Sequence, residues 1–116
     1  MIKGIGIDAV DLERMRGIIT KKPQFAQRVL TPKEAVLFAA LPLKRQVEFL
    51  AGRYACKEAF SKAWGTGIGQ VTFQELEILT DPLGAPYFSL SPHTGRTFVS
   101  ITHTDTVAFA QVILEE

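Results

Sequence analysis

The residues most suited to chemistry lie between Arg53 and Gly69, in a segment that reads as a helix followed by a glycine-rich loop. At about 100° per residue, one half of this helix carries the charged and polar side chains. Those side chains are Arg53, Lys57, Glu58, Ser61 and Lys62. Cations and a carboxylate beside a flexible glycine turn could bind a divalent metal ion and the phosphate groups of a ligand.

An ordinary structural interpretation explains the same helix. Glu58 and Lys62 form an i, i+4 pair in the favourable order, which stabilises an exposed helix by about 0.3 kcal/mol whatever its function. Gly65 suits the left-handed position just after a helix, which glycine adopts at little cost. The helix by itself therefore favours this structural interpretation, and other parts of the chain must decide.

Length and composition predict one globular domain. The chain has 116 residues, of which 47% are hydrophobic and 22% charged, and this composition excludes extensive disorder. Its single cysteine, Cys56, rules out an internal disulfide and fits a reducing compartment. Because Cys56 lies on the apolar half of its helix, a buried thiol is favoured over a nucleophile. Neither a signal peptide nor a long apolar run is visible, so we expect a soluble, cytoplasmic protein without a membrane anchor.

Charge is distributed unevenly along the chain. Residues 14–33 contain six basic residues and no acidic one, whereas residues 72–116 contain six acidic residues and one basic residue. The basic segment suggests an acidic partner, and a solvated helix face explains it about equally well. Nucleic acid is disfavoured as that partner, because the segment has one aromatic residue, Phe25, and the chain shows no nucleic-acid-binding motif.

The predicted elements are a strand, several helices and then a run of strands. A strand over residues 2–7 ends at Asp8, and a helix follows over residues 11–20. The sequence Thr31-Pro-Lys-Glu34 predicts a helix start with a capping box, and the long helix begins near Lys44. Further strands are expected over residues 72–80, 86–90, 97–102 and 106–114. This order predicts an α+β fold in which the long helix packs on an antiparallel sheet.

Three short motifs together carry a resemblance to a known family. They are Gly4-Ile-Gly-Ile-Asp8, Lys57-Glu-Ala-Phe-Ser-Lys62 with its glycine loop, and Ser100-Ile-Thr-His-Thr104. Each has an ordinary explanation, since Asp8 could cap a turn and His103 could be a polar hairpin residue. In this order they resemble the small 4′-phosphopantetheinyl transferases, the holo-[acyl-carrier-protein] synthase family. The resemblance covers nearly the entire chain and includes residues 25–31, Glu34, residues 48–53 and Gly84-Ala-Pro86. Cys56 and Trp64 depart from the alanine and the frequent phenylalanine of the family.

The resemblance implies a single transferase domain over residues 1–116. Members of this family move the 4′-phosphopantetheine arm of coenzyme A to a serine of an acyl carrier protein and release adenosine 3′,5′-bisphosphate. They require Mg²⁺, and their product supports fatty acid biosynthesis. The family's metal carboxylates fall on Asp8 and Glu58 and its motif lysine on Lys62, so we expect these three residues to be catalytic. The small members are homotrimers with active sites between subunits, and the resemblance implies the same here.

Further residues are expected to contact coenzyme A. The resemblance implies nucleotide contacts from the neighbouring subunit by Gly84-Ala-Pro86, His103 and Thr104. The candidates for another nucleotide phosphate are the cations Lys44, Arg45 and Arg53. The backbone of Gly65-Thr66-Gly67 could let the phosphates or the pantetheine arm approach closely, and Ser61 and Lys62 lie just before it.

The basic segment gains a partner from the same resemblance, because acyl carrier proteins are acidic. The expected carrier contacts are the cations Arg14, Lys21, Lys22 and Arg28, with Met15 and Phe25 as apolar contacts. We expect neither a nucleic acid nor a membrane as partner.

Several alternatives stay open at this point. Glu58 is the candidate general base, either directly or through a metal-bound water, and Glu34 is another candidate although capping explains it equally well. A non-catalytic module that binds coenzyme A or an acidic protein is the main rival, and the intact set of Asp8, Glu58 and Lys62 argues against it. A Mg²⁺-dependent hydrolase of a pyrophosphate-containing nucleotide is a second rival. The sequence does not decide whether the protein prefers Mg²⁺ or Mn²⁺. It also does not decide which carrier proteins and acyl-coenzyme A forms are accepted.

Overall fold

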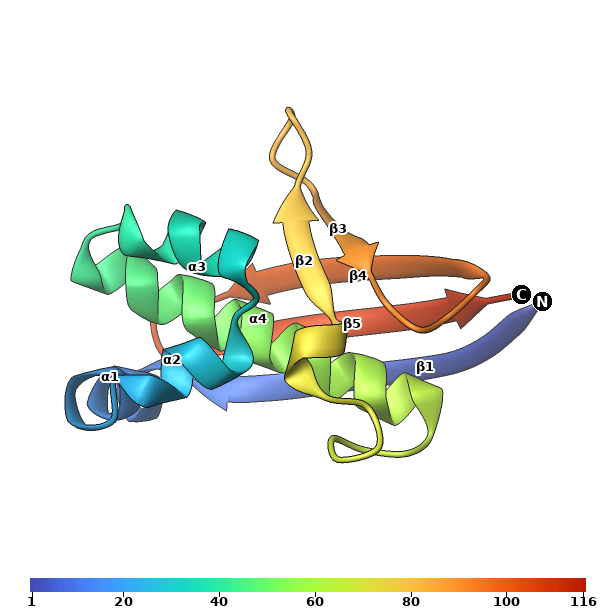
Figure 1. Ribbon diagram of the computed structural model, residues 1–116, viewed down its shortest axis with the longest axis horizontal. Coiled ribbons are helices and arrows are strands. Elements are labelled where there is room, and N and C mark those ends of the chain that lie inside the picture. The colour runs from blue at the N-terminus through green and yellow to red at the C-terminus, as the bar shows by residue number, and fades with distance from the viewer.

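A long helix, α4 (Leu43–Trp64), lies across one face of a three-stranded antiparallel sheet in the computed structural model, which describes residues 1–116 (Figure 1). The strand order in this sheet is β1 (Ile2–Asp11), β5 (Val107–Glu115) and β4 (Arg96–His103). The other elements are the helices α1 (Leu12–Lys21), α2 (Gln24–Val29) and α3 (Pro32–Ala39), the 3₁₀ turn η1 (Phe73–Glu75) and the hairpin of β2 (Glu77–Thr80) and β3 (Pro86–Leu90). This architecture confirms the predicted α+β fold.

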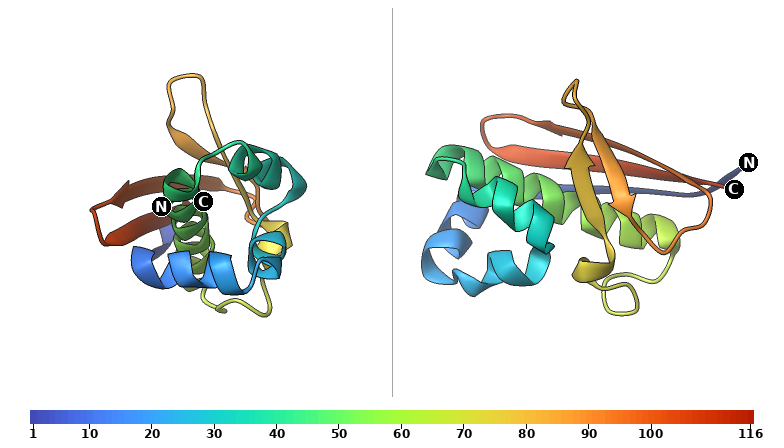
Figure 2. Two further views of the ribbon diagram at one scale, coloured as in Figure 1. Left: turned by 90° about the vertical axis from the view of Figure 1, so that its left-hand side faces the viewer. Right: turned by 45° about the horizontal axis from the view of Figure 1, so that its top comes forward.

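Helix α4 is covered on most of its circumference. The three short helices gather around its first half, and the β2–β3 hairpin projects away from the rest of the chain (Figures 1 and 2). Side chains that point in different directions from α4, such as Leu50, Cys56 and Phe60, are all fully buried. A helix buried on both sides reads as apolar over more than one face, and its charged residues must therefore find partners inside the protein.

Two glycines of β1 let α4 approach the sheet closely. A side chain at Gly4 would collide with the carbonyl oxygen of Ala63, and a side chain at Gly6 would collide with that of Ala59. Asp8 follows these glycines at the same two-residue spacing, so its side chain points to the same face of the strand. The glycines of the first motif are thus a packing requirement, and Asp8 is the residue that they bring against α4.

Strand β1 is longer than predicted. It continues to Asp11 instead of ending at residue 7, because it pairs with β5 along its length, with Asp8 opposite Ala110. The expectation that Asp8 lies at a strand end is therefore wrong. Asp11 takes the capping role that the sequence allowed for Asp8, since its carboxylate accepts from the backbone N–H groups at the start of α1.

The segment after the glycine loop also differs from the prediction. The expected strand over residues 72–80 is a strand only from Glu77, because Thr72 and Glu75 form a capping box that starts η1. The short helix α2 is absent from the prediction, since six residues are too few to show a helical period. Both the capping box of Thr31 before α3 and the left-handed Gly65 after α4, with φ of 94°, are confirmed.

The face of the three-stranded sheet opposite α4 has no cover (Figure 2). Ile5 and Phe98 lie on either side of Ile113 of the central strand, and Ile7 follows along β1. Three of these side chains, Ile5, Ile7 and Phe98, are exposed. A contiguous apolar surface of this kind marks an interaction site in a folded protein.

Candidate active site

The three predicted catalytic residues meet between β1 and α4. Asp8 comes from β1, and Glu58 and Lys62 lie one turn apart on α4. The Lys62 ammonium donates to the Asp8 carboxylate at 3.2 Å and to the Ile7 carbonyl at 3.0 Å. About half of the Lys62 side chain is exposed, so the group is open to a ligand. We call this group of three residues the β1 flank of α4.

The two carboxylates of the β1 flank disturb each other. Partial burial raises the pKa of Glu58, and the negative charge of Asp8 raises it further. The Tyr54 hydroxyl and the positive charge of Lys62 oppose both effects. Two acidic groups held together in this way favour a cation between them.

The donor set of the β1 flank fits Mg²⁺. Nowhere in the chain do three or more His, Cys, Asp or Glu residues form a group that could hold a metal ion, which argues against a closed four-ligand site. Mg²⁺ is commonly bound by one or two carboxylates, with water and substrate phosphate oxygens as its remaining ligands. Asp8 and Glu58 are the residues that would hold it.

Lys57 and Ser61 do not belong to an exposed charged face, contrary to the expectation from the helical pattern. Lys57 is fully buried and donates to the Glu34 carboxylate at 2.7 Å and to the carbonyls of Val29 and Phe73. Ser61 is also buried, and its hydroxyl donates to the Glu58 carbonyl at 2.7 Å. The middle of the polar half of α4 is covered by α2 and η1, and only its two edges reach the surface.

Glu34 is excluded as the general base. Its side chain is fully buried, and its oxygens accept from Lys57 and from the backbone N–H groups of Thr31 and Ile78. The capping interpretation of Glu34 is therefore confirmed, and its carboxylate has no access to a substrate.

A cleft of about 300 Å³ lies on the other side of α4, between that helix, β4 and the β2–β3 hairpin. Four of the predicted coenzyme A contacts line it: Arg45, Arg53, Pro86 and His103. Gly84 lines it as well. We call this cleft the β4 flank of α4. It joins residues from three segments that are distant in the sequence, namely residues 41–53, 80–86 and 101–103.

Arg53 has unused capacity to bind an anion on the β4 flank. Its Nε donates to the Ile78 carbonyl at 3.2 Å, and its guanidinium lies over the Phe49 ring at 4.1 Å. Its Nη2 atom is buried without a hydrogen-bond partner, although Arg53 as a whole is 7% exposed and lines the cleft. Burial lowers the pKa of Arg53. An unpaired donor of this kind is expensive, and a phosphate oxygen in the cleft would satisfy it.

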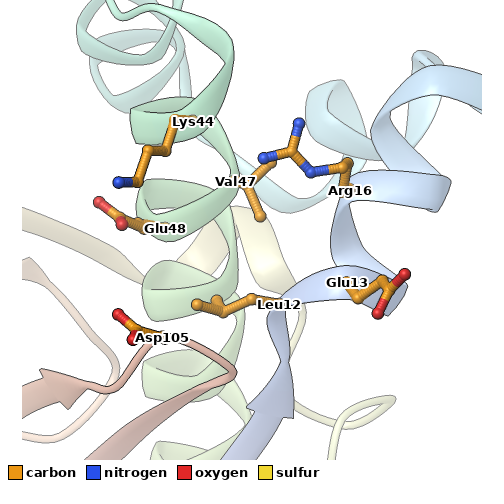
Figure 3. A pocket seen from close by; sticks show the side chains of 7 residues that line it. All are labelled: Leu12, Glu13, Arg16, Lys44, Val47, Glu48 and Asp105. Carbon is orange, nitrogen blue, oxygen red and sulfur yellow. The ribbon is translucent and has the colours of Figure 1, made fainter.

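Lys44 lies in a neighbouring hollow of about 210 Å³ (Figure 3). Its ammonium points toward Glu48, and Arg16 of α1 and Asp105 of the β4–β5 turn line the same hollow (Figure 3). Glu48 also lines the β4 flank, so the two hollows are contiguous at this residue. The predicted contact residue Thr104 closes the β4–β5 turn, where its hydroxyl accepts from the backbone N–H groups of Thr106 and Val107.

The β1 and β4 flanks lie on opposite sides of one helix. In the sheet, Asp8 and Ile101 both pair with Ala110 of the central strand, so they lie on its two edges. Two strand spacings of about 4.8 Å separate them, and α4 lies over the space between. The expected division of the site therefore changes: Arg45 and Arg53 share a cleft with Pro86 and His103 of the same chain, and not with Asp8.

The glycine loop continues directly from the β1 flank. Gly65 and Gly67 both have left-handed backbone conformations, with φ of 94° and 74°, which explains why glycine is required at these positions. Thr66 between them is exposed. Its backbone N–H and that of Gly67 both point to the Ser61 carbonyl.

The basic segment forms a surface near the β1 flank. Arg14, Lys21 and Lys22 line one side of α1, and the Arg28 guanidinium of α2 lies over the Phe25 ring at 5.9 Å. Met15 is only 2% exposed and belongs to the core, so its expected contact with a carrier is wrong. The helical period of α1 places Met15 on the inner face beside Leu12.

Sequence reasoning missed Tyr54 and Glu48. Tyr54 lies one turn before Glu58 on α4, and Glu48 lines both hollows, the one with Lys44 and the one with Arg45. The i, i+4 relation between Tyr54 and Glu58 is visible in the sequence. It carries no signal by itself, because an aromatic residue on a helix is usually part of the core.

These features define a class of enzyme with a carboxylate pair on one side of a central helix and a cationic cleft on the other. A sequence profile described as the 4′-phosphopantetheinyl transferase superfamily matches residues 4–112, and the chain belongs to this superfamily. The chain is 65% identical over 115 residues to the holo-[acyl-carrier-protein] synthase of Enterococcus faecalis. The alignment covers 99% of this chain and 98% of that protein.

Solved structures agree with the sequence comparison. The holo-(acyl-carrier-protein) synthase of Bacillus anthracis, in complex with CoA (3′,5′-ADP), has a TM-score of 0.93 and 42% identity over 99% of this chain and 97% of that chain. The holo-[acyl-carrier-protein] synthase of Neisseria meningitidis has a TM-score of 0.90 and 38% identity over the full length of both chains. In this chain, no helix is long and apolar enough to span a membrane.

Proposed function

We propose that this chain transfers the 4′-phosphopantetheine arm of coenzyme A to a serine of an apo acyl carrier protein. The products are holo acyl carrier protein and adenosine 3′,5′-bisphosphate, and the reaction supports fatty acid biosynthesis in the cytoplasm. The observation that carries the proposal is the meeting of Asp8, Glu58 and Lys62 at an open surface, beside a glycine loop. High identity to a holo-[acyl-carrier-protein] synthase along the whole chain supports it.

Mg²⁺ at Asp8 and Glu58 is part of the proposal. When bound there, the ion would neutralise charge on the pyrophosphate oxygens of coenzyme A. Lys62 adds a second positive charge next to Asp8, and its exposed ammonium is free to exchange the Ile7 carbonyl for a phosphate oxygen. We assign Lys62 to the phosphate that leaves with the nucleotide.

Glu58 is the proposed general base. The serine oxygen of the carrier forms a bond to the phosphorus on the pantetheine side, and the bond from that phosphorus to the bridging oxygen breaks. The serine proton passes to Glu58, and the electron pair of the broken bond leaves on adenosine 3′,5′-bisphosphate.

The β4 flank is the proposed nucleotide site. Arg45 and His103 are exposed at its mouth, and Arg53 presents its unpaired nitrogen from below. Arginine binds phosphate by two parallel hydrogen bonds, which suits the additional phosphate group of coenzyme A. Pro86, beside the turn of the hairpin, supplies a rigid apolar wall for the nucleobase or ribose.

An acidic carrier protein would approach the basic surface of α1 and α2. The charge of Arg14 acts on Tyr54, which lies one turn before Glu58 on α4, so this surface adjoins the β1 flank. Arg14, Lys21, Lys22 and Arg28 provide the charges, and half-buried Phe25 is the remaining apolar contact. A carrier docked here would present its serine to Glu58.

We further propose that the active chain is a homotrimer with its active sites between subunits. In one chain the β1 and β4 flanks lie on opposite sides of α4 and share no cleft, which supports a site that two chains complete together. The bare sheet face, with Ile5, Ile7 and Phe98 exposed, supports such an association.

Intact-mass spectrometry tests the proposed function. Apo acyl carrier protein is incubated with this protein, coenzyme A and Mg²⁺. The proposal predicts that the carrier gains the mass of one phosphopantetheine group, and that a chelator prevents the gain. An unmodified carrier with cleaved coenzyme A would favour the hydrolase, and an unmodified carrier with bound, intact coenzyme A would favour the binding module.

A further inference from the structure

Glu48 is the only acidic residue that lines the β4 flank, the cleft proposed to bind the nucleotide. The other ionisable side chains of this cleft are Arg45, Arg53 and His103. Glu48 follows Arg45 by one turn of α4, and its side chain is 19% exposed. A carboxylate in a phosphate-binding cleft repels the ligand, unless a hydrogen-bond donor of the ligand faces it. Glu48 therefore indicates where a donor group of the ligand lies.

The carboxylate of Glu48 is only loosely paired within the chain. Its Oε1 lies 3.5 Å from the Arg45 Nε and 4.0 Å from the His103 Nε2. Charge-assisted hydrogen bonds are shorter, at about 2.8 Å between the two heavy atoms. The Lys44 ammonium points toward Glu48 from the neighbouring hollow (Figure 3). The basic side chains around Glu48 keep it charged, and its carboxylate retains the capacity to accept a hydrogen bond from a ligand.

The proposed nucleotide has a hydrogen-bond donor next to its phosphate. Adenosine 3′,5′-bisphosphate, the nucleotide part of coenzyme A, has a free 2′-hydroxyl on the ribose carbon beside the one that carries the 3′-phosphate. Arg45 and His103 are proposed ligands of this phosphate, and both lie within 4.0 Å of the Glu48 Oε1. A phosphate bound by these two residues brings its neighbouring hydroxyl toward Glu48. In other nucleotide sites, a carboxylate likewise binds a ribose 2′-hydroxyl.

We propose that Glu48 is a specificity-determining residue, which accepts a hydrogen bond from the 2′-hydroxyl of the nucleotide and excludes a phosphate from that position. The inference rests on the proposed function, because it takes adenosine 3′,5′-bisphosphate as the nucleotide of the β4 flank. It explains why a cleft lined by basic residues contains one carboxylate. The competing role is that Glu48 only orients Arg45, and it would then affect 2′- and 3′-phosphorylated nucleotides alike.

The test compares two regioisomers of one nucleotide. Isothermal titration calorimetry gives the Kd of adenosine 3′,5′-bisphosphate and of adenosine 2′,5′-bisphosphate for the wild type and for Glu48→Gln. We expect the wild type to bind the 3′ isomer at least about 10-fold more tightly, because a 2′-phosphate would face the Glu48 carboxylate. In Glu48→Gln this ratio should fall by about 10-fold, with an unchanged Tm. Glu13→Gln is the matched control, since Glu13 lines the hollow of Lys44 together with Glu48 and does not line the β4 flank.

Three results would overturn the inference. A wild type that binds both isomers equally, or neither, would remove the specificity. An unchanged ratio in Glu48→Gln, with both affinities altered alike, would leave Glu48 only the role of orienting Arg45. An equal fall of the ratio in Glu13→Gln would assign the effect to the general charge of this surface. The titrations need no carrier protein, so a wild type that discriminates between the isomers and modifies no carrier would contradict the proposed function alone.

Discussion

Two lysine–carboxylate pairs on α4 use the same residue types in opposite surroundings. Lys57 and Glu34 are 2.7 Å apart and both side chains are 0% exposed. Lys62 and Asp8 are 3.2 Å apart, and their side chains are 54% and 18% exposed. The buried pair packs under α2, α3 and η1, whereas the open pair lies between α4 and the edge strand β1.

The difference between the pairs lies in unused bonding capacity. Lys57 donates to three acceptors, and Glu34 accepts from two backbone N–H groups as well as from Lys57, so neither has capacity left for a ligand. Lys62 and Asp8 have fewer partners and an open side. Burial with complete hydrogen bonding makes a charged pair structural, and exposure with unused donors and acceptors makes it available for chemistry.

Breaking the buried pair should cause the largest change. Lys57→Met leaves the Glu34 carboxylate buried without its cation, and we expect the free energy of unfolding to fall by about 3–5 kcal/mol. Lys62→Met, the matched change in the open pair, should cost less than about 1 kcal/mol. Urea unfolding followed by circular dichroism measures both. The double variant Glu34→Gln/Lys57→Met should recover part of the loss, and equal losses from the two lysine variants would remove the distinction between the pairs.

Breaking the open site should change activity and leave stability as it is. Glu58→Gln removes one of the two carboxylates, and we expect kcat for transfer to fall by about 100- to 1,000-fold. Its free energy of unfolding should stay within about 0.5 kcal/mol of the wild type, because Glu58 is outside the buried network. Steady-state kinetics and urea unfolding provide the two numbers. Activity that persists in Glu58→Gln at low Mg²⁺ would contradict the metal role.

Reversing a charge on α1 tests whether the surface beside the open pair of Lys62 and Asp8 takes part in carrier binding. Arg14→Glu should raise the KM for the carrier by about 10-fold, because it reverses a charge that we propose to steer the acidic carrier. The KM for coenzyme A should not change. Lys33→Glu is the control, since Lys33 belongs to the same basic stretch of sequence and lies on α3 instead of α1. A similar rise in both KM values would assign Arg14 to coenzyme A or to the fold.

The smallest effect concerns the thiol on the buried side of the helix. Burial raises the pKa of Cys56 to about 12, because the thiolate is disfavoured away from water. At pH 8 we expect no reaction of the native protein with a disulfide reagent and full reaction in denaturant, read by absorbance. Lys57→Met should speed the native reaction, because it increases opening of this side of α4. Rapid labelling of the native wild type would contradict the buried assignment.

The sequence predicted the order and type of most helices and strands. Turn and capping residues are local signals, so the helix start at Thr31 and the helix end at Gly65 were both correct. The end of β1 and the start of β2 depend on pairing with distant strands or on a competing cap, and there the prediction was wrong. Local patterns therefore located the elements, and long-range pairing decided their bounds.

For the site, the motifs predicted a cluster of residues that the structure does bring together, and they missed the burial of its neighbours. Asp8, Glu58 and Lys62 meet as expected, because close packing at Gly4 and Gly6 brings β1 against α4. A helical projection cannot tell Lys57 from Lys62, since covering helices are not part of it. For the same reason, the sequence did not predict the burial of Met15 or the separation of the two flanks of α4. Only the three-dimensional arrangement reveals them.

Mixing two inactive variants tests most directly whether the β1 flank and the β4 flank of different chains complete one site. Asp8→Asn damages the first flank, and Arg45→Ala/His103→Ala damages the second, all at surface side chains. The two proteins are unfolded together in urea, refolded and assayed for carrier modification by intact-mass spectrometry. Our account predicts that the mixture regains part of the wild-type activity, because some neighbouring chains then present two intact flanks. A mixture that forms oligomers and remains as inactive as either variant alone would show that each site is built from one chain, and would contradict the account.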